Sequence, residues 1–193
     1  MKREDLLRNI SETAYNVGYG AKKHFATFDI IAKLPGIIAF SSTAVGVFSL
    51  LVEYPSKKFL SAAFIVFGMA GLRIGMWDHK KTEYAEAGEA LTAVFNKLKA
   101  LHFQVKAAKD EDLPKFEEAL ADLQGEYSRL GRSNQILFSD WYAHYKFFWQ
   151  QQIQWIEEYR KFGFWRDKVP LSLSAAVLFI IVVSIVSIVI KLR

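Results

Sequence analysis

The sequence of 193 residues contains no cysteine and only four prolines. Without thiolates a closed cysteine zinc site is excluded, although this absence leaves the cellular compartment open. The four histidines show no ligand spacing with one another or with a pair of carboxylates. They are His24, His79, His102 and His144. We therefore predict no metal site and no cofactor.

Signatures of catalysis are also lacking. The glycines of residues 59–77 lie inside an apolar stretch, whereas a phosphate loop needs glycines between a strand and a helix. Sets of serine, histidine and aspartate can be named in any chain of this size, and no spacing singles one out here. The sequence therefore predicts a protein that is not an enzyme.

Charge is nearly absent from three stretches, residues 34–52, 59–77 and 171–190, although 23% of the chain is charged. Only Arg73 lies inside one of them, about one turn from its end, where a long side chain reaches the lipid headgroups. About 20 helical residues match the roughly 30 Å of hydrocarbon in a bilayer. Two soluble core helices would instead carry a charged outer face. We predict three membrane spans, the first two forming a hairpin through the turn 53–58.

The basic residues at the span ends predict the orientation. Nine Lys and Arg residues flank the spans on the side of the N-terminus and the middle region, against four in the hairpin turn and the C-terminal tail. Because positive residues favour the cytoplasm, we predict a cytoplasmic N-terminus and middle region and a C-terminus outside. The net charge of +5 is too modest to indicate a nucleic-acid binder.

Apolar periodicity predicts helices in the cytoplasmic part. Steps of three and four over residues 4–28 predict an amphipathic helix lying on the membrane or against a partner helix. After the second span, two sets of apolar residues seven apart form a short heptad seam. The seam consists of Tyr84, Leu91, Leu98 and Val105 with Ala87, Val94 and Leu101. Because no Gly-Pro pair separates seam and span, we predict one helix over about 59–108.

Further along, Asp112 is predicted to cap a helix that Gly131 closes. A third cytoplasmic helix is predicted over about 133–162, and its end near Trp165 fits an aromatic belt ahead of the third span. Its earlier rings either pack against the heptad helix or form a ligand or partner surface, since nucleobases stack on such rings. The candidates for that surface are Trp141, Tyr145, Lys146, Trp149, Trp155 and Arg160.

Together these features predict an all-α integral membrane protein. It combines a transmembrane helical hairpin, long cytoplasmic helices with a short coiled-coil seam, and a third, C-terminal transmembrane helix. Its parts are an N-terminal amphipathic helix (1–33), the transmembrane hairpin (34–77), a cytoplasmic helical region (78–169), and the C-terminal transmembrane helix with its tail (170–193).

Small residues recur on one face of each span, including a GxxxG pattern in the second. Because lipid offers little hydrophobic drive between helices, small faces allow the close contact that holds spans together. Alternatively, the serine stripes face water along a pore axis. The span-packing or pore-lining candidates are Ser42, Gly46, Ser49, Ser61, Gly68, Gly71, Gly75, Ser184 and Ser187. The candidate interface charges are Arg73, Lys80 and Lys81.

The overall plan resembles a known family. Three features together are similar to the SLATT family. They are a helical segment containing Ala14-Tyr15 to Lys23-His24, two spans joined by a very short turn, and a basic exit from Arg73 to Lys81 into a long helix. The SLATT proteins are the SMODS and SLOG-associating two-transmembrane effectors of bacterial immunity. The resemblance covers roughly residues 5–108, and the third span departs from the two-span plan.

This resemblance implies an oligomeric effector, a tetramer or larger ring, that permeabilises the bacterial inner membrane on infection. Its expected partners are membrane lipid, further copies of the chain, and a nucleotide or oligonucleotide second messenger or the enzyme that makes it. A protein partner and the release of an inhibitor stay open as triggers. Two other classes also stay open, a membrane-anchored helical scaffold and a holin-like phage protein.

Overall fold

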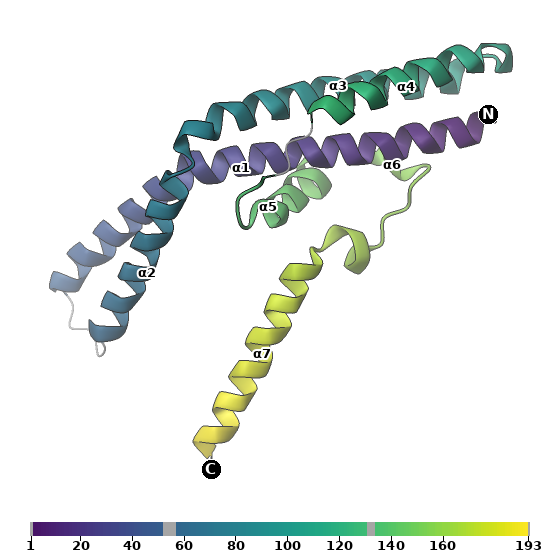
Figure 1. The fold of residues 1–193 in the computed structure, drawn as a ribbon. Helices are drawn as coiled ribbons and strands as arrows, with labels where there is room; N and C mark the ends of the chain where they lie inside the picture. Colours follow the sequence, from purple (N-terminus) through teal and green to yellow (C-terminus); the bar gives the residue numbers. More distant parts are fainter. Residues whose placement is uncertain (1, 52–56, 131–133, 193) are drawn as a thin grey trace.

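The computed structural model describes residues 2–51, 57–130 and 134–192. This part of the chain is almost entirely helical and contains no strand, which confirms the all-α class. In Figure 1, a helical bundle lies at one end and two helical arms extend from it. Most of the predicted hairpin turn, as well as Gly131, lies outside the described residues.

Helix α1 (Arg3–Leu51) runs through both the bundle and the hairpin. Its 49 residues span about 74 Å at 1.5 Å per residue. The predicted amphipathic segment and the first span therefore form one helix, and Pro35 lies inside it. Proline removes one backbone hydrogen bond, but a break in lipid would leave further backbone groups without water as a partner. The helix continues for that reason.

Helix α2 (Lys57–Gly75) returns alongside α1 and completes the hairpin. The prediction of one regular helix over 59–108 is wrong, because a turn and the 3-10 helix η1 (Asp78–Lys80) separate α2 from α3 (Lys81–Ala107). The backbone N–H of Trp77 donates to the carbonyl of Ile74 (2.9 Å), a tighter bond than α-helix geometry gives. Gly75, a weak helix former, precedes this turn. Figure 1 shows the change of direction.

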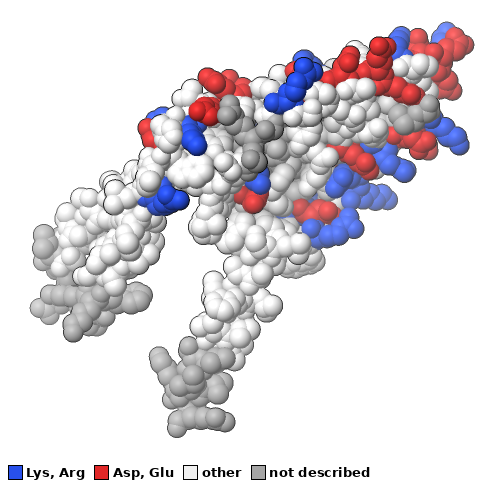
Figure 2. Space-filling model, in the orientation of Figure 1, with Lys and Arg blue, Asp and Glu red and all other residues white. Residues whose placement is uncertain are grey.

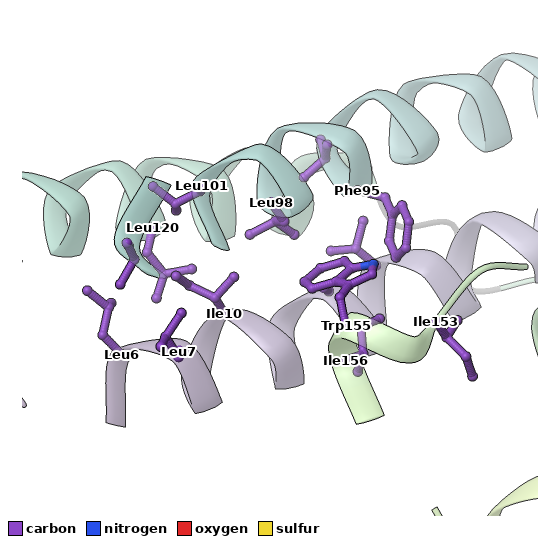
Figure 3. Packing of buried hydrophobic residues seen from close by; sticks show 14 of the residues in the cluster. Leu6, Leu7, Ile10, Phe95, Leu98, Leu101, Leu120, Ile153, Trp155 and Ile156 are labelled. Carbon is purple, nitrogen blue, oxygen red and sulfur yellow. The ribbon is translucent and has the colours of Figure 1, made fainter. Parts of the chain in front are cut away.

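The bundle is built on α1, α3 and α4 (Leu113–Leu130). All seven seam residues of α3 are buried, and so is the predicted apolar face of α1 from Leu6 to His24. Figure 3 shows Leu6 and Ile10 of α1 pointing toward Leu101 of α3 and Leu120 of α4. The N-terminal helix therefore packs against a partner helix within the chain. The heptad seam closes the bundle and is not available for contacts between copies.

The connection from α3 to α4 begins with a second 3-10 helix, η2 (Asp110–Asp112). Asp112 directly precedes α4, at the predicted capping position, and its carboxylate accepts a hydrogen bond at 2.8 Å from Lys115 Nζ in the first turn of that helix. Arg3 fastens the N-terminus here, donating to the carbonyl of Ala108 (2.6 Å) and to the carboxylate of Asp110 (2.7 Å).

The prediction of one helix over 133–162 is also wrong. The segment forms α5 (Ser139–Tyr145), the π-helical turn η3 (Lys146–Gln150) and α6 (Gln154–Glu157). Phe138, just before α5, has a left-handed φ of 68°, the only such non-glycine residue in the described part. The short elements place Phe147, Trp155 and Ile156 together in the core against α1 and α3. Burial of these large side chains favours the broken path over a straight helix.

A further π-helical turn, η4 (Phe164–Lys168), leads into α7 (Leu171–Leu192). Trp141 Nε1 donates to Ser172 Oγ at 2.8 Å and ties the start of α7 to α5. Figure 2 shows charge concentrated on the bundle, whereas the described parts of the hairpin and of α7 are almost free of it. Two helical stretches are long and apolar enough to span a membrane, 3–49 and 60–107. The described apolar part of α7, Leu171–Ile185, is shorter, and the third span stays a prediction.

His102 of α3 is buried, and neither ring nitrogen has a hydrogen-bond partner in the described part of the chain. The rings of Trp155 and Tyr159 lie 5.0 and 5.5 Å from its own, centroid to centroid. Burial lowers the pKa of His102 below its usual 6.5, and Lys106 adds to this, while Glu158 opposes it. Burial therefore disfavours the protonated form of His102 in the folded chain.

We expect acid to weaken the bundle through this residue. Above pH 6.5 His102 is neutral whether the chain is folded or unfolded; below it the unfolded chain takes up a proton that the folded chain resists, so stability falls as the pH drops. Thermal unfolding of the detergent-solubilised protein at pH 7.5 and about 5.5 measures the loss. His102→Phe should flatten the pH dependence, whereas His79→Phe, at an exposed position, should keep it. An unchanged pH dependence in His102→Phe would contradict the assignment.

A candidate site at the junction of hairpin and bundle

The region where the bundle meets the hairpin combines ion pairs and an apolar groove. Helix α1 passes through it at residues 19–38, α2 ends there, and residues 134–146 pack against both. We call this region the junction. Among the described helices, α1 alone runs through both the bundle and the hairpin, and the junction lies on it.

An ion network joins α1 to the π-helical turn. The carboxylate of Asp29 accepts Lys146 Nζ at 2.6 Å and Lys33 Nζ at 2.6 Å. The side chains of Asp29 and Lys146 are 12% and 16% exposed. The ammonium of Lys146 also lies 4.6 Å from the ring centroid of Tyr142, a cation–π distance. We call Asp29, Lys33 and Lys146 the junction network.

The charges of this network stabilise one another. Burial alone raises the pKa of Asp29, but hydrogen bonds from Lys146 and Lys33 outweigh it and leave the pKa below its usual value. Burial lowers the pKa of nearby Lys22, and the charge of Lys146 adds to this. Removing Lys146 or Asp29 would leave the other charge poorly hydrated and without its partner, so loss of either one is costly.

Three neutral or ionic contacts extend the attachment of α1 to α5 and the segment before it. Tyr19 Oη lies 2.7 Å from His144 Nδ1. Lys23 Nζ pairs with Asp140 at 2.8 Å. Thr27 Oγ1 donates to Gln135 Oε1 at 2.5 Å. Together with Asp29, these residues form a ladder along α1 just before it enters the apolar stretch, so α5 is held to the helix that crosses the membrane.

Beside the network lies an apolar groove of about 750 Å³, which we call the junction groove. Its walls come from α1, α2 and residues 135–142, and its lining is apolar apart from Arg73 and a few polar groups. Its lining includes the side chains of Ile38, Phe67, Arg73, Ile74, Leu137 and Phe138. The groove therefore faces the boundary between the apolar hairpin and the charged bundle.

The predicted small-residue face divides between two environments. A Cβ on Gly71 would lie 3.8 Å from Ile38 of α1, which places Gly71 at the hairpin interface. A Cβ on Gly46, Gly68 or Gly75 would meet nothing within 4 Å in the described part of the chain. Gly71 therefore lies within contact range of the facing span, whereas the space before Gly46, Gly68 and Gly75 is open in the described part of the chain.

The predicted serines are placed less uniformly. Ser49 Oγ donates to the carbonyl of Gly46 at 2.7 Å, a bond within its own helix. Ser42 is half-buried on α1, whereas Ser61 and Ser184 are exposed. Ser187 belongs to α7, but its side chain lies outside the described residues. The described serines thus differ in burial, and the pore-lining alternative stays a prediction.

The predicted interface charges lie at the end of α2 and just after it. Arg73 is exposed and donates to Met76 Sδ at 3.8 Å. Lys80 lies 5.7 Å above the ring of Trp77, and Lys81 pairs with Asp78 at 2.8 Å. All three surround the change of direction between α2 and α3.

The six predicted ligand-surface residues do not form one surface. Trp155 is only 5% exposed and belongs to the core, a correction that follows from its contact with the heptad helix at Phe95. Lys146 belongs to the junction network. Arg160 lies 4.2 Å above the ring of Tyr15. Trp141 donates a hydrogen bond to Ser172. Of the six predicted residues, two are left that are exposed. These are Tyr145 and Trp149.

Sequence reasoning missed the junction network. Asp29 stands four residues before Lys33, a spacing that favours a helical ion pair and was a detectable signal. Its second partner, Lys146, is 117 positions away, and no local pattern reveals such a pair. Gln135 and His144 are hidden for the same reason.

Comparison with known proteins identifies the family. No curated protein and no solved structure matches the chain. A family model described as "SMODS and SLOG-associating 2TM effector domain 6" matches residues 1–178, extending the predicted resemblance over the whole bundle and the start of α7. Its two transmembrane segments agree with the hairpin. The chain therefore belongs to the SLATT family of membrane effector domains of bacterial antiphage systems.

Proposed function

We propose that this effector assembles into a ring and opens a permeation path through the bacterial inner membrane when its bundle receives a signal. The observation that carries this proposal is α1, which runs without interruption from the bundle core into the hairpin. A rotation or shift of the bundle end of a continuous helix displaces its membrane end as well. The family membership supplies the effector role that this geometry would serve.

Assembly would use the hairpin. The heptad seam is buried inside the bundle, so we assign no contact between copies to it. A Cβ on Gly46, Gly68 or Gly75 would meet open space in the described part of the chain. Small residues on an outward face allow another helix to approach closely in lipid. We therefore assign the contacts between subunits to this face of the spans.

The signal would reach α1 through the junction. Residues 139–146 carry the exposed Tyr145 at one end of α5 and the contacts to α1 along their length. A nucleotide would need cations beside its phosphates, and Lys146 and Arg160 are already engaged within the chain. A protein partner, including a nucleotide-synthesising enzyme, fits the exposed Tyr145 and Trp149 better than a free nucleotide does.

Vesicle leakage tests the proposal. The full chain, reconstituted at increasing density into vesicles loaded with potassium or a small dye, is expected to release the contents with a steep dependence on density, because a ring needs several copies. Chemical crosslinking of the same vesicles should show oligomers at the densities that leak. Absence of release at densities where crosslinking shows complete rings would favour a membrane-anchored scaffold. A lysis-enzyme gene beside the coding gene would favour the holin-like alternative.

A further inference from the structure

The junction groove lies at a depth where a membrane helix meets lipid headgroups. Arg73 is four residues before Trp77, where α2 gives way to the turn and the charged residues Asp78 to Lys81 begin. Trp77 and Trp141 both line the groove, and indoles favour the headgroup layer. One end of the groove therefore faces hydrocarbon and the other faces the headgroups.

The apolar wall of the groove is open to an acyl chain. Leu137 and Phe138 are 74% and 51% exposed, and they face Ile38, Phe67 and Ile74 across the groove. Phe138 holds its left-handed conformation directly before α5, and Ser139 behind it is buried. The chain thus fixes two large apolar side chains next to the hairpin although packing within the bundle does not cover them. Exposed apolar surface of this kind is favourable against lipid and unfavourable in water.

The cation of the groove lacks an acidic partner. Arg73 donates to the sulfur of Met76, and no carboxylate of the described residues lies within 4 Å of its guanidinium. Lys80 stands nearby above Trp77, so the mouth of the groove is basic. A guanidinium at the edge of hydrocarbon is stabilised by an anion with several acceptor oxygens, and the phosphate of a lipid is the anion found at that depth.

We propose that the junction groove binds one anionic phospholipid, with an acyl chain between the hairpin and Leu137–Phe138 and the phosphate on Arg73. The hydrogen bond from Trp141 to Ser172 keeps the wall of the groove in place beside the start of α7. The bound lipid would bridge α2 and the segment before α5, and so would make the junction sensitive to membrane composition. This proposal requires insertion of the hairpin in a bilayer and does not depend on whether the protein conducts.

Native mass spectrometry of the full chain in mild detergent tests the site. Phosphatidylglycerol and phosphatidylcholine with identical acyl chains serve as the two probes. The wild-type protein is expected to retain one phosphatidylglycerol per chain, about fivefold more readily than phosphatidylcholine, because one basic residue near the surface contributes that preference. Arg73→Gln should abolish the preference, and Arg73→Lys should keep most of it.

The matched control is Lys109→Gln, which removes the same charge at the far end of the bundle and should leave lipid retention unchanged. Leu137→Gln, at an exposed position, should lower retention of both lipids equally. An unchanged preference in Arg73→Gln would overturn the proposal. So would a Leu137→Gln protein that loses subunits from its oligomer while retaining lipid, since the groove would then hold a second copy of the chain.

Discussion

Gly18→Ala is expected to destabilise the bundle, whereas Gly20→Ala, two residues along the same helix, is expected to be neutral or stabilising. A Cβ at Gly18 would lie 2.8 Å from the ring of Phe95 and 2.9 Å from that of Phe147. At Gly20 the nearest atom is a methyl carbon of Leu91 at 3.7 Å, an ordinary van der Waals contact. The two glycines therefore differ in the space before them.

The rings facing Gly18 cannot easily move. Phe147 is fully buried, and its ring packs edge-on against Tyr15 at 5.5 Å between centroids. The ring centroids of Phe95 and Trp155 lie 5.7 Å apart. Close packing of this kind transmits an added methyl group to several neighbours. Gly18 is thus required for the approach of α1 to both α3 and the π-helical turn.

The pair of variants separates packing from helix propensity. Alanine favours the helix over glycine by about 1 kcal/mol at either position. This gain cancels in the comparison, so the two free energies of unfolding should differ by the overpacking term, about 1–3 kcal/mol. Thermal unfolding in detergent, followed by the loss of helical circular dichroism, measures the difference. Equal free energies of unfolding of the two variants would show that the rings of Phe95 and Phe147 move aside without loss of stability.

Repeating patterns account for the part of the fold that was predicted correctly. The seam from Tyr84 to Val105 repeats over three heptads, and the face of α1 from Leu6 to His24 repeats over five turns. Over such lengths only one side of a helix can be buried. Local sequence therefore determines which faces pack, and it left open only whether the partner was the membrane or another helix.

The breaks in the helices depend on tertiary contacts and were not predictable. The turn after Gly75 and the π-helical turn at Lys146 carry no proline, so local sequence alone favours helix there. What favours the break at Lys146 is the burial of Phe147 and Trp155 against helices more than forty residues earlier in the chain. The division of the small-residue face has a similar origin. Gly71 and Gly75 belong to one GxxxG pattern. They differ because Ile38 of α1 lies 3.8 Å from a Cβ placed on Gly71, whereas a Cβ on Gly75 meets no described atom within 4 Å.

That division predicts opposite roles for two glycines of α2. A cysteine placed at Gly68 should form disulfides between copies under mild oxidation, because the space before this position is open in the described part of the chain. A cysteine at Gly71 should not, because Ile38 of the same chain lies against it. The sequence contains no cysteine, so each variant carries a single thiol. Equal crosslinking at both positions would place the contact between subunits elsewhere.

Leucine substitutions on the same helix should have the largest effect on function. Gly75→Leu adds a bulky side chain where no described atom of the hairpin lies within 4 Å of the Cβ, and is expected to abolish both the ring and vesicle leakage. Gly71→Leu should instead displace Ile38 and lower the thermal stability of the hairpin itself. Leu72→Ala, an exposed position between them, is the control and should leave all three properties unchanged. If Gly75→Leu lost leakage while keeping its ring, the outward glycines would shape the permeation path rather than hold the subunits together.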